Sequence, residues 1–182
     1  QDKGVGISLS DGNSANPDFV VIGVGVQPAS SIAEEAGIDC SNGILVDENC
    51  KTSDENVYAA GDCANHYFSK YGFRQRLESV QNAIDQAKTV SSSILGRPIA
   101  YNSVPWFWSD QYDLKLKIAG LSKESDLIVI RGKIDDSRFS ACHFKENKLI
   151  AVECVNDQKT FMLGKKLIEA SSKITPDAII DE

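Results

Sequence analysis

The sequence predicts an α/β unit that is followed by an α+β unit with an antiparallel sheet. Phe19–Ile22 is a continuous, largely β-branched apolar run, which is typical of a buried strand in a parallel sheet. A long helix with apolar residues at helical spacing follows from near Glu78. From Leu114 to Ile118, apolar residues alternate with lysines, which indicates a half-buried strand in a second kind of sheet.

In the first unit, the strand Phe19–Ile22 ends in the small-residue turn Gly23–Pro28. Glycine lets the backbone of such a turn approach a partner closely. Ser30–Ala36 then predicts a short helix that starts at serine and stops at Gly37. Two further strands are expected on either side of a polar connection, at Gly43–Asp47 and Asn56–Asp62.

The long helix closes the first unit. Gly96 and Pro98 predict its end, because glycine favours the conformation that stops a helix and proline cannot continue one. Apolar residues at helical spacing indicate an amphipathic core helix. These residues are Val80, Ala83, Ile84, Ala87 and Ile94.

The second unit begins near Tyr101. Asp126–Arg131 predicts a strand, and Phe139–Phe144 and Leu149–Val155 flank a polar turn, which predicts an antiparallel hairpin. A helix with one apolar stripe follows, and Thr175–Pro176 has the pattern of the cap and first residue of another helix. The stripe consists of Leu163, Leu167, Ala170 and Ile174.

Composition excludes several classes of protein. With Lys+Arg 19 against Asp+Glu 26, the net charge is −7, which argues against a nucleic-acid-binding protein. No apolar run approaches the ~20 residues that a membrane span needs. The first residues carry no basic and apolar leader, so no secretory signal is expected. Because they also lack a starting methionine, the chain is expected to begin inside a longer one.

The five cysteines are scattered, odd in number and without a C-x-x-C pair. Only His66 and His143 accompany them, so neither a zinc site nor a disulfide scaffold is expected. They are expected to be reduced thiols in a cytoplasmic protein. Basic residues group at Lys70, Arg74 and Arg76, and this group is either a solvated loop or a docking patch for an acidic partner.

Two motifs point to chemistry. The predicted strand that ends in Gly61-Asp62 places a carboxylate at the carboxyl edge of a sheet, where open α/β folds bind ligands. That carboxylate can accept hydrogen bonds from ligand hydroxyl groups, although a plain turn has the same pattern.

Trp106 and Trp108 are costly to expose, and at strand spacing both indoles point to one face. A tryptophan-rich core edge without a ligand is the alternative there.

These strings resemble the two-dinucleotide-binding flavoproteins. Tyr58–Asp62 is similar to their second FAD motif, which implies that Gly61 admits the ligand and that Asp62 holds the ribityl chain. Val20–Pro28 is similar to the glycine turn between their NAD and FAD domains, which implies that Val24 and Gly25 lie near bound nicotinamide.

Two longer strings indicate a branch of that family. Arg76–Ala87 resembles the flavin-contacting helix of ferredoxin reductases, which implies a backbone contact from Ser79 and Val80 and places Glu78 near the nicotinamide. Val104–Leu116 resembles the opening of the C-terminal domain in the oxygenase-coupled branch, of the putidaredoxin-reductase and biphenyl-dioxygenase-reductase type. This resemblance implies that Trp108 borders the isoalloxazine and that Trp106 supports it. Reductases of the glutathione-reductase type carry a His-Pro pair in the C-terminal domain, whereas neither histidine of this sequence precedes a proline.

The resemblance implies an enzyme that passes electrons from NAD(P)H through FAD to a 2Fe-2S ferredoxin. It implies the end of an NAD-binding domain at 1–28, the C-terminal part of an FAD-binding domain at 29–100 and a reductase C-terminal domain at 101–182. No general acid, nucleophile or metal ligand is expected. Neither G-x-G-x-x-G pyrophosphate turn occurs in the sequence, so an N-terminal portion is expected to be missing.

Alternatives remain open. The chain could be an inactive fragment or interaction module that binds no cofactor. It could also be part of a related NADH oxidase, rubredoxin reductase or monodehydroascorbate reductase. Trp106-Phe107-Trp108 favours the ferredoxin branch.

Overall fold

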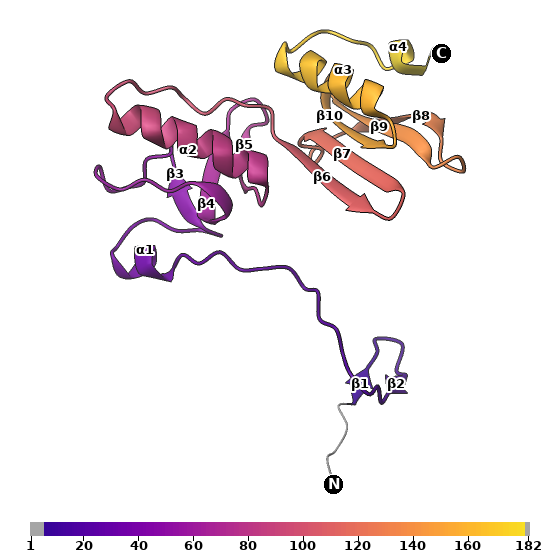
Figure 1. Ribbon diagram of the computed structural model, residues 1–182, viewed down its shortest axis with the longest axis horizontal. Coiled ribbons are helices and arrows are strands. Elements are labelled where there is room, and N and C mark those ends of the chain that lie inside the picture. Colours follow the sequence, from indigo (N-terminus) through magenta and orange to yellow (C-terminus); the bar gives the residue numbers. More distant parts are fainter. Residues whose placement is uncertain (1–5, 181–182) are drawn as a thin grey trace.

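The computed structural model describes residues 6–180. An N-terminal segment leads into a small α/β body, and a linker connects that body to an antiparallel sheet (Figure 1). Within residues 6–180, no helix combines the length and apolar character that crossing a bilayer requires.

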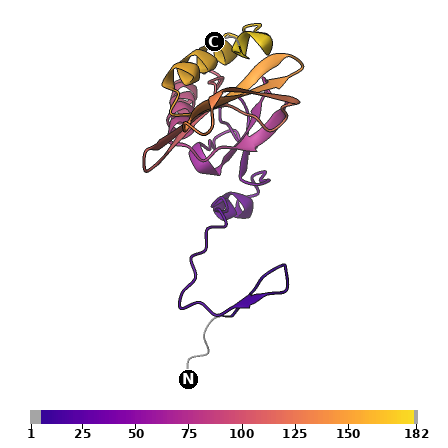
Figure 2. The ribbon, with the colours of Figure 1, turned by 90° about the vertical axis from the view of Figure 1, so that its right-hand side faces the viewer.

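The N-terminal segment extends away from the rest of the molecule (Figure 2). It contains the short antiparallel pair β1 (Ile7–Ser8) and β2 (Ser14–Ala15), and later the helix α1 (Ser31–Glu35). The prediction of a buried strand at Phe19–Ile22 is wrong for this structure, because Phe19 is 81% exposed and Val21 is 86% exposed. A parallel strand requires neighbouring strands, and among residues 6–180 none pairs with this run.

The α/β body contains a three-stranded sheet with the order β3-β4-β5. β3 runs parallel to β4, and β5 runs antiparallel to β4. The long helix α2 packs beside this sheet (Figure 1). The elements are β3 (Ile44–Val46), η1 (Gly61–Cys63), β4 (Ala64–Phe68), β5 (Phe73–Arg76) and α2 (Val80–Ile94).

The strand predicted at Asn56–Asp62 does not form as such. The backbone of Val57 and Ala59 bonds locally to Thr52 and Cys50, at 3.0 and 3.1 Å, instead of to a sheet neighbour. The turn η1 follows, and β4 begins only at Ala64. The predicted long helix is confirmed and begins at Val80.

The second body is a five-stranded antiparallel sheet with the order β6-β7-β10-β9-β8. The predicted hairpin is confirmed as β9 paired with β10. One face of the sheet is covered by α3, with Val152, Phe144 and Phe161 in the shared core. The elements are β6 (Trp106–Gln111), β7 (Leu114–Gly120), β8 (Leu127–Lys133), β9 (Arg138–Lys145), β10 (Lys148–Val155), α3 (Gln158–Glu169) and α4 (Asp177–Ile180).

The ends of the last two helices differ slightly from prediction. α3 ends at Glu169, so Ala170 and Ile174 lie beyond it, although Ile174 still packs against the core. α4 begins at Asp177, directly after the predicted cap Thr175–Pro176. The predicted fold class, α/β plus α+β with an antiparallel sheet, is confirmed.

The two bodies share a hydrophobic cluster that includes Phe68, Tyr71, Leu121 and Ile150. The Tyr71 hydroxyl donates to the Ile150 oxygen at 3.3 Å, and burial raises the pKa of Tyr71 to about 12, so the hydroxyl keeps its proton. The Lys70 ammonium donates to the Ile168 oxygen at 2.6 Å, at the C-terminal end of α3. A cation at that end of a helix is favourable. These contacts join the α/β body to β10 and α3.

Candidate cofactor site

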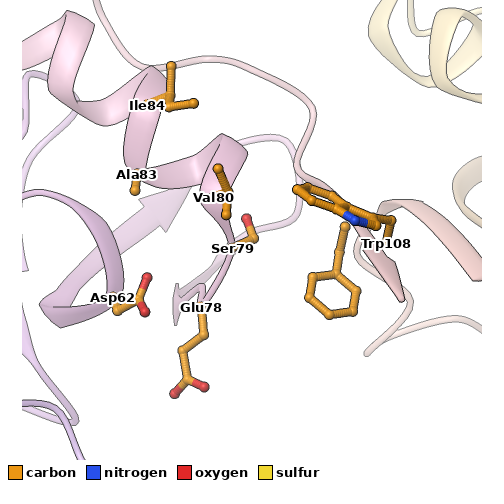
Figure 3. A pocket seen from close by; sticks show the side chains of 8 residues that line it. Asp62, Glu78, Ser79, Val80, Ala83, Ile84 and Trp108 are labelled. Atoms are coloured by element: carbon orange, nitrogen blue, oxygen red, sulfur yellow. The ribbon is translucent and has the colours of Figure 1, made fainter. Parts of the chain in front are cut away.

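A cavity of about 450 Å³ lies between the start of α2 and the edge strand β6. Figure 3 shows Asp62 on one side of this cavity, Trp108 on the other and the first turn of α2 between them. Its walls combine apolar side chains with carboxylates. The lining residues are Asp62, Glu78, Ser79, Val80, Ala83, Ile84, Phe107 and Trp108.

The first turn of α2 presents both a helix N-terminus and an apolar wall. Ser79 caps the helix, because its hydroxyl oxygen accepts a hydrogen bond from the Asn82 N–H at 3.2 Å. Val80 and Ile84 stay 59% and 45% exposed on the cavity side. A helix N-terminus carries free N–H groups and partial positive charge, which suits an electron-rich ligand edge.

Gly61 and Asp62 form a tight turn against α2. Gly61 adopts a φ of 80°, which favours glycine. A β-carbon at Gly61 would lie 3.4 Å from the Ala83 β-carbon, so a larger residue would also push against the helix. The Asp62 side chain projects from this turn into the cavity (Figure 3).

Arg76 connects Asp62 and Glu78, the two acidic residues that line the cavity. Its Nη1 donates to the main-chain oxygen of Asp62 at 2.9 Å and to the Glu78 carboxylate at 2.6 Å. The Arg76 side chain is only 9% exposed, whereas Glu78 is 43% exposed. Arg76 therefore supports the site from behind while Glu78 stays accessible to a ligand.

The grouped basic residues Lys70, Arg74 and Arg76 all make hydrogen bonds within the protein. Arg74 donates to the Val46 and Asn65 oxygens, both at 3.0 Å, and Arg76 and Lys70 make the internal bonds already described. Arg74 and Arg76 lie on the strand β5 and not in a loop. Lys70 and Arg74 remain exposed, so a docking patch for an acidic partner stays a prediction.

Trp108 forms the far wall as part of an aromatic group. As predicted for strand spacing, Trp106 and Trp108 lie on one face of β6, with ring centroids 5.4 Å apart. Trp106 in turn contacts Phe161 of α3 at 5.9 Å, and the Lys165 ammonium lies 5.7 Å from the Trp106 ring. Trp108 remains 40% exposed, so its indole is available to a ligand.

Most predicted site residues are brought together. Asp62, Glu78, Ser79, Val80 and Trp108 line the cavity, and Gly61 adjoins it. Two residues predicted near the nicotinamide, Val24 and Gly25, do not line it: Val24 is 89% exposed, and Gly25 is its neighbour in the extended segment.

Sequence reasoning missed Phe107 and Arg76. Strand alternation places Phe107 on the face opposite Trp108, yet β6 is an edge strand, so both of its faces reach the cavity. The only sequence signal for Arg76 was its position beside Glu78. Within the described part of the chain, no group of His, Cys, Asp and Glu side chains could hold a metal ion.

The cavity fits part of a flavin. A planar, apolar ring with a polar edge needs an apolar wall, an aromatic neighbour and hydrogen-bond donors, and Val80, Trp108 and the α2 N-terminus supply these. A carboxylate beside the ring suits a polyhydroxylated chain, and Asp62 supplies one. These residues match one side of such a site and include no pyrophosphate anchor.

Two protein-family models and several known proteins match the chain. Residues 1–87 match the Pyridine nucleotide-disulphide oxidoreductase family, and residues 106–182 match the Reductase C-terminal family. The ferredoxin reductase subunit of 5,5'-dehydrodivanillate O-demethylase from Sphingobium sp. is 41% identical over 100% of this chain and 44% of its own length. Along its whole length the chain is similar to ferredoxin reductases. Rhodocoxin reductase from Rhodococcus erythropolis is 40% identical over 98% of the chain and 42% of its own length.

Solved ferredoxin reductase structures share the fold. A ferredoxin reductase from Rhodopseudomonas palustris superposes with a TM-score of 0.91 at 44% identity, over 97% of this chain and 44% of that one. Putidaredoxin reductase in its covalent complex with putidaredoxin gives 0.89 at 35% identity, over 95% of this chain and 42% of that one. The chain thus spans less than half the length of the relatives it matches.

Proposed function

We propose that this chain forms one side of the FAD site in an NAD(P)H-dependent ferredoxin reductase. The observation that carries the proposal is the convergence of Asp62, the α2 N-terminus and Trp108 on a single cavity. The family match supports the same reading. We also propose the domain division 1–28, 29–100 and 101–182.

Each residue has a proposed task. The Asp62 carboxylate accepts hydrogen bonds from ribityl hydroxyls, and the close turn at Gly61 lets the chain approach. The N–H groups of Ser79 and Val80 face the pyrimidine edge, where positive potential favours the reduced ring. FAD, when bound, supplies the hydride acceptance and the single-electron release. The residues of this chain bind the ring, orient it and shield it from water.

The proposed nicotinamide contacts come from two places. Glu78 lies at the mouth of the cavity, with its carboxylate oriented by Arg76 at 2.6 Å. Val24 and Gly25 lie in the exposed N-terminal segment, next to apolar residues that have no covering partner within residues 6–180. We propose that this segment reaches the nicotinamide when the rest of the NAD-binding domain is present.

The proposed partner is an acidic 2Fe-2S ferredoxin. The chain has a net charge of −7, yet lysines gather beside the tryptophans. The Lys117 ammonium lies 5.5 Å from the Phe161 ring, and the Lys165 ammonium lies 5.7 Å from the Trp106 ring. Such local positive charge next to the cofactor would steer an acidic partner to the shortest electron path.

The proposed location is the cytoplasm. All five cysteines are free thiols, of which Cys50, Cys142 and Cys154 are buried. Burial raises the pKa of Cys50 to about 12 and that of Cys142 to about 11, so these thiols stay protonated and inert. Free thiols of this kind are typical of a reducing compartment.

Rubredoxin is the second candidate acceptor, because a rubredoxin–NAD(+) reductase from Pseudomonas putida is 35% identical over 81% of this chain.

The test of the proposed function is acceptor preference in a full-length protein that contains this chain, loaded with FAD and supplied with NADH or NADPH. We expect rapid reduction of a 2Fe-2S ferredoxin and slow reduction of rubredoxin or oxygen. Equal NADH consumption with and without a protein acceptor would indicate an oxidase. No NAD(P)H consumption with any acceptor would overturn the proposal.

A further inference from the structure

We propose that Gln86 and Asn82 are positioning residues that lock the Gly61-Asp62 turn to the start of α2. The inference rests on the proposed flavin site and adds residues to it that touch no ligand. Both side chains lie on the face of α2 that points away from the cavity. They act through the backbone of the residues that line it.

Gln86 holds the turn directly. Its side-chain oxygen accepts a hydrogen bond from the Gly61 N–H at 2.7 Å, within the buried interior. Gln86 is 1% exposed. Without that acceptor, the Gly61 N–H would be buried and unpaired, so the turn would move toward solvent. Because Asp62 follows directly, such a movement would displace its carboxylate.

Asn82 holds the other end of the site. Its side-chain nitrogen donates to the Leu77 main-chain oxygen at 3.1 Å and lies 3.4 Å from the Gln86 side-chain oxygen. Leu77 immediately precedes Glu78 and Ser79. The amide pair therefore joins the two segments that carry the proposed flavin contacts.

Tyr101 extends this network to the linker before β6. Its hydroxyl donates to the Asn82 side-chain oxygen at 2.9 Å, and its own N–H donates to the Glu48 oxygen at 2.7 Å. Burial raises the pKa of Tyr101, so the hydroxyl remains a donor throughout the physiological range. The linker leads into the strand that carries Trp108, so all three parts of the cavity wall connect through one buried network.

The residue types argue for a specific role. The inner face of a helix normally carries apolar side chains, and a buried amide costs free energy unless all its groups are bonded. Here Gln86, Asn82 and Thr89 are the buried residues of α2. Each of the first two makes a hydrogen bond to a main-chain group at one end of the proposed site: Gln86 to Gly61 and Asn82 to Leu77. An apolar residue would fill the same volume without fixing those groups.

The test uses a full-length protein that contains this chain. The variant is Gln86→Met, which keeps the length of the side chain and removes the acceptor. The matched control is Gln81→Met, because Gln81 lies on the same helix and bonds only Asp85 among side chains, at 2.9 Å. The measurements are the FAD dissociation constant and the FAD dissociation rate at a temperature where all variants stay folded, with the melting temperature of each apoprotein recorded separately.

We expect Gln86→Met to raise the FAD dissociation constant about tenfold, equivalent to about 1.4 kcal/mol. Gln81→Met should stay within about twofold of wild type. If Gln86→Met does not fold, Tyr101→Phe provides the test instead. This variant removes one hydroxyl and should raise the FAD dissociation constant about threefold.

A purely structural role makes a different prediction. It would lower the melting temperature of the apoprotein and leave the FAD dissociation constant unchanged at the lower temperature, and this result would overturn the inference. If the wild-type protein binds no FAD, the proposed function itself fails, and the inference falls with it. Wild-type binding with unchanged variants refutes the inference alone.

Discussion

Arg76 and Glu78 form an ion pair of 2.6 Å in which the arginine is buried and the carboxylate is exposed. The same arginine nitrogen donates to the main-chain oxygen of Asp62 at 2.9 Å. One guanidinium thus sets the relative position of two acidic residues. We propose that Asp62 binds the ribityl chain and that Glu78 lies near the nicotinamide. The pair supports the cavity wall, and its exposed member, Glu78, lines the cavity.

Replacement of Arg76 should therefore weaken binding of both ligands. Hydrogen bonds to charged groups contribute about 1.5–3 kcal/mol, so Arg76→Met should raise the FAD dissociation constant at least about tenfold. It should also raise the KM for NAD(P)H, because Glu78 loses its orientation. Flavin fluorescence titration and steady-state kinetics measure these effects. Arg97→Met, at an exposed position, is the control, and equal effects from both variants would contradict the assignment.

Replacement of Trp108 should remove the aromatic wall. An aromatic contact contributes about 0.5–1.5 kcal/mol beyond its buried area, so Trp108→Ala should raise the FAD dissociation constant by up to about tenfold. Trp108→Phe should retain most of the affinity. Tyr112 is 100% exposed, and Tyr112→Ala provides the control in the same titration. If Trp108→Ala and Tyr112→Ala bind FAD equally well, Trp108 does not contact the flavin.

Charge reversal at the lysines should impair the ferredoxin reaction selectively. The double variant Lys117→Glu and Lys165→Glu should raise the KM for ferredoxin severalfold at low salt. The effect should shrink near 1 M salt, where the screening length falls to about 3 Å. The control is Lys133→Glu, which alters a lysine on β8 at the opposite edge of the sheet. A KM that is insensitive to both the variant and the salt would argue for another docking face.

Substitution of Gly164 should destabilise the second body. A β-carbon there would lie 2.7 Å from the Val152 Cγ1, and Val152 is fully buried at 0% exposure. Overpacking costs about 1–3 kcal/mol, against a gain of about 1 kcal/mol in helix propensity. Gly164→Ala should therefore lower the free energy of unfolding by up to about 2 kcal/mol in urea titrations. Gly23→Ala, with no atom within 4 Å, should be neutral; an equal loss there would refute the packing argument.

The buried His66 should make the fold sensitive to mild acid. Burial lowers the pKa of His66, while the hydrogen bond between its Nδ1 and the Asp47 oxygen, at 3.2 Å, acts in the opposite direction. Below about pH 6.5 the unfolded histidine binds a proton that the folded one resists, so stability falls as the pH falls. The slope is at most about 1.4 kcal/mol per pH unit. Urea titrations between pH 7 and pH 5 should show a smaller slope for His66→Asn, and an unchanged slope would exclude His66 as the cause.

The sequence predicted the elements whose contacts are local. The helix α2 and the hairpin β9–β10 follow from spacing and turn residues within one segment. The predictions that failed concern sheet pairing, which depends on other segments of the chain. Phe19–Ile22 has the composition of a buried strand, but the strands that would bury it are not among residues 6–180. At Asn56–Asp62, local backbone bonds to residues 50–52 replace sheet pairing, which hydrophobicity alone does not reveal.

The candidate site was predictable where a motif carries the contact. Asp62, Glu78 and Trp108 come from three separate strings and meet at one cavity. Arg76 was misread because a grouped charge looks solvated in sequence, and its bonds to Asp62 and Glu78 depend on the fold. Gln86 looked like an ordinary polar position on the helix, although it is 1% exposed. Burial of a polar group is a property of the tertiary structure, so no spacing rule predicts it.

The most direct test is the visible absorption spectrum of a full-length protein that contains this chain, after incubation with excess FAD and removal of free ligand. The same spectrum is recorded for Asp62→Ala, which removes the proposed ribityl acceptor. The account predicts retained flavin in the wild-type protein and weaker retention in the variant. A folded, colourless wild-type protein, or a variant that retains flavin as tightly as wild type, would contradict the central claim that this cavity holds FAD.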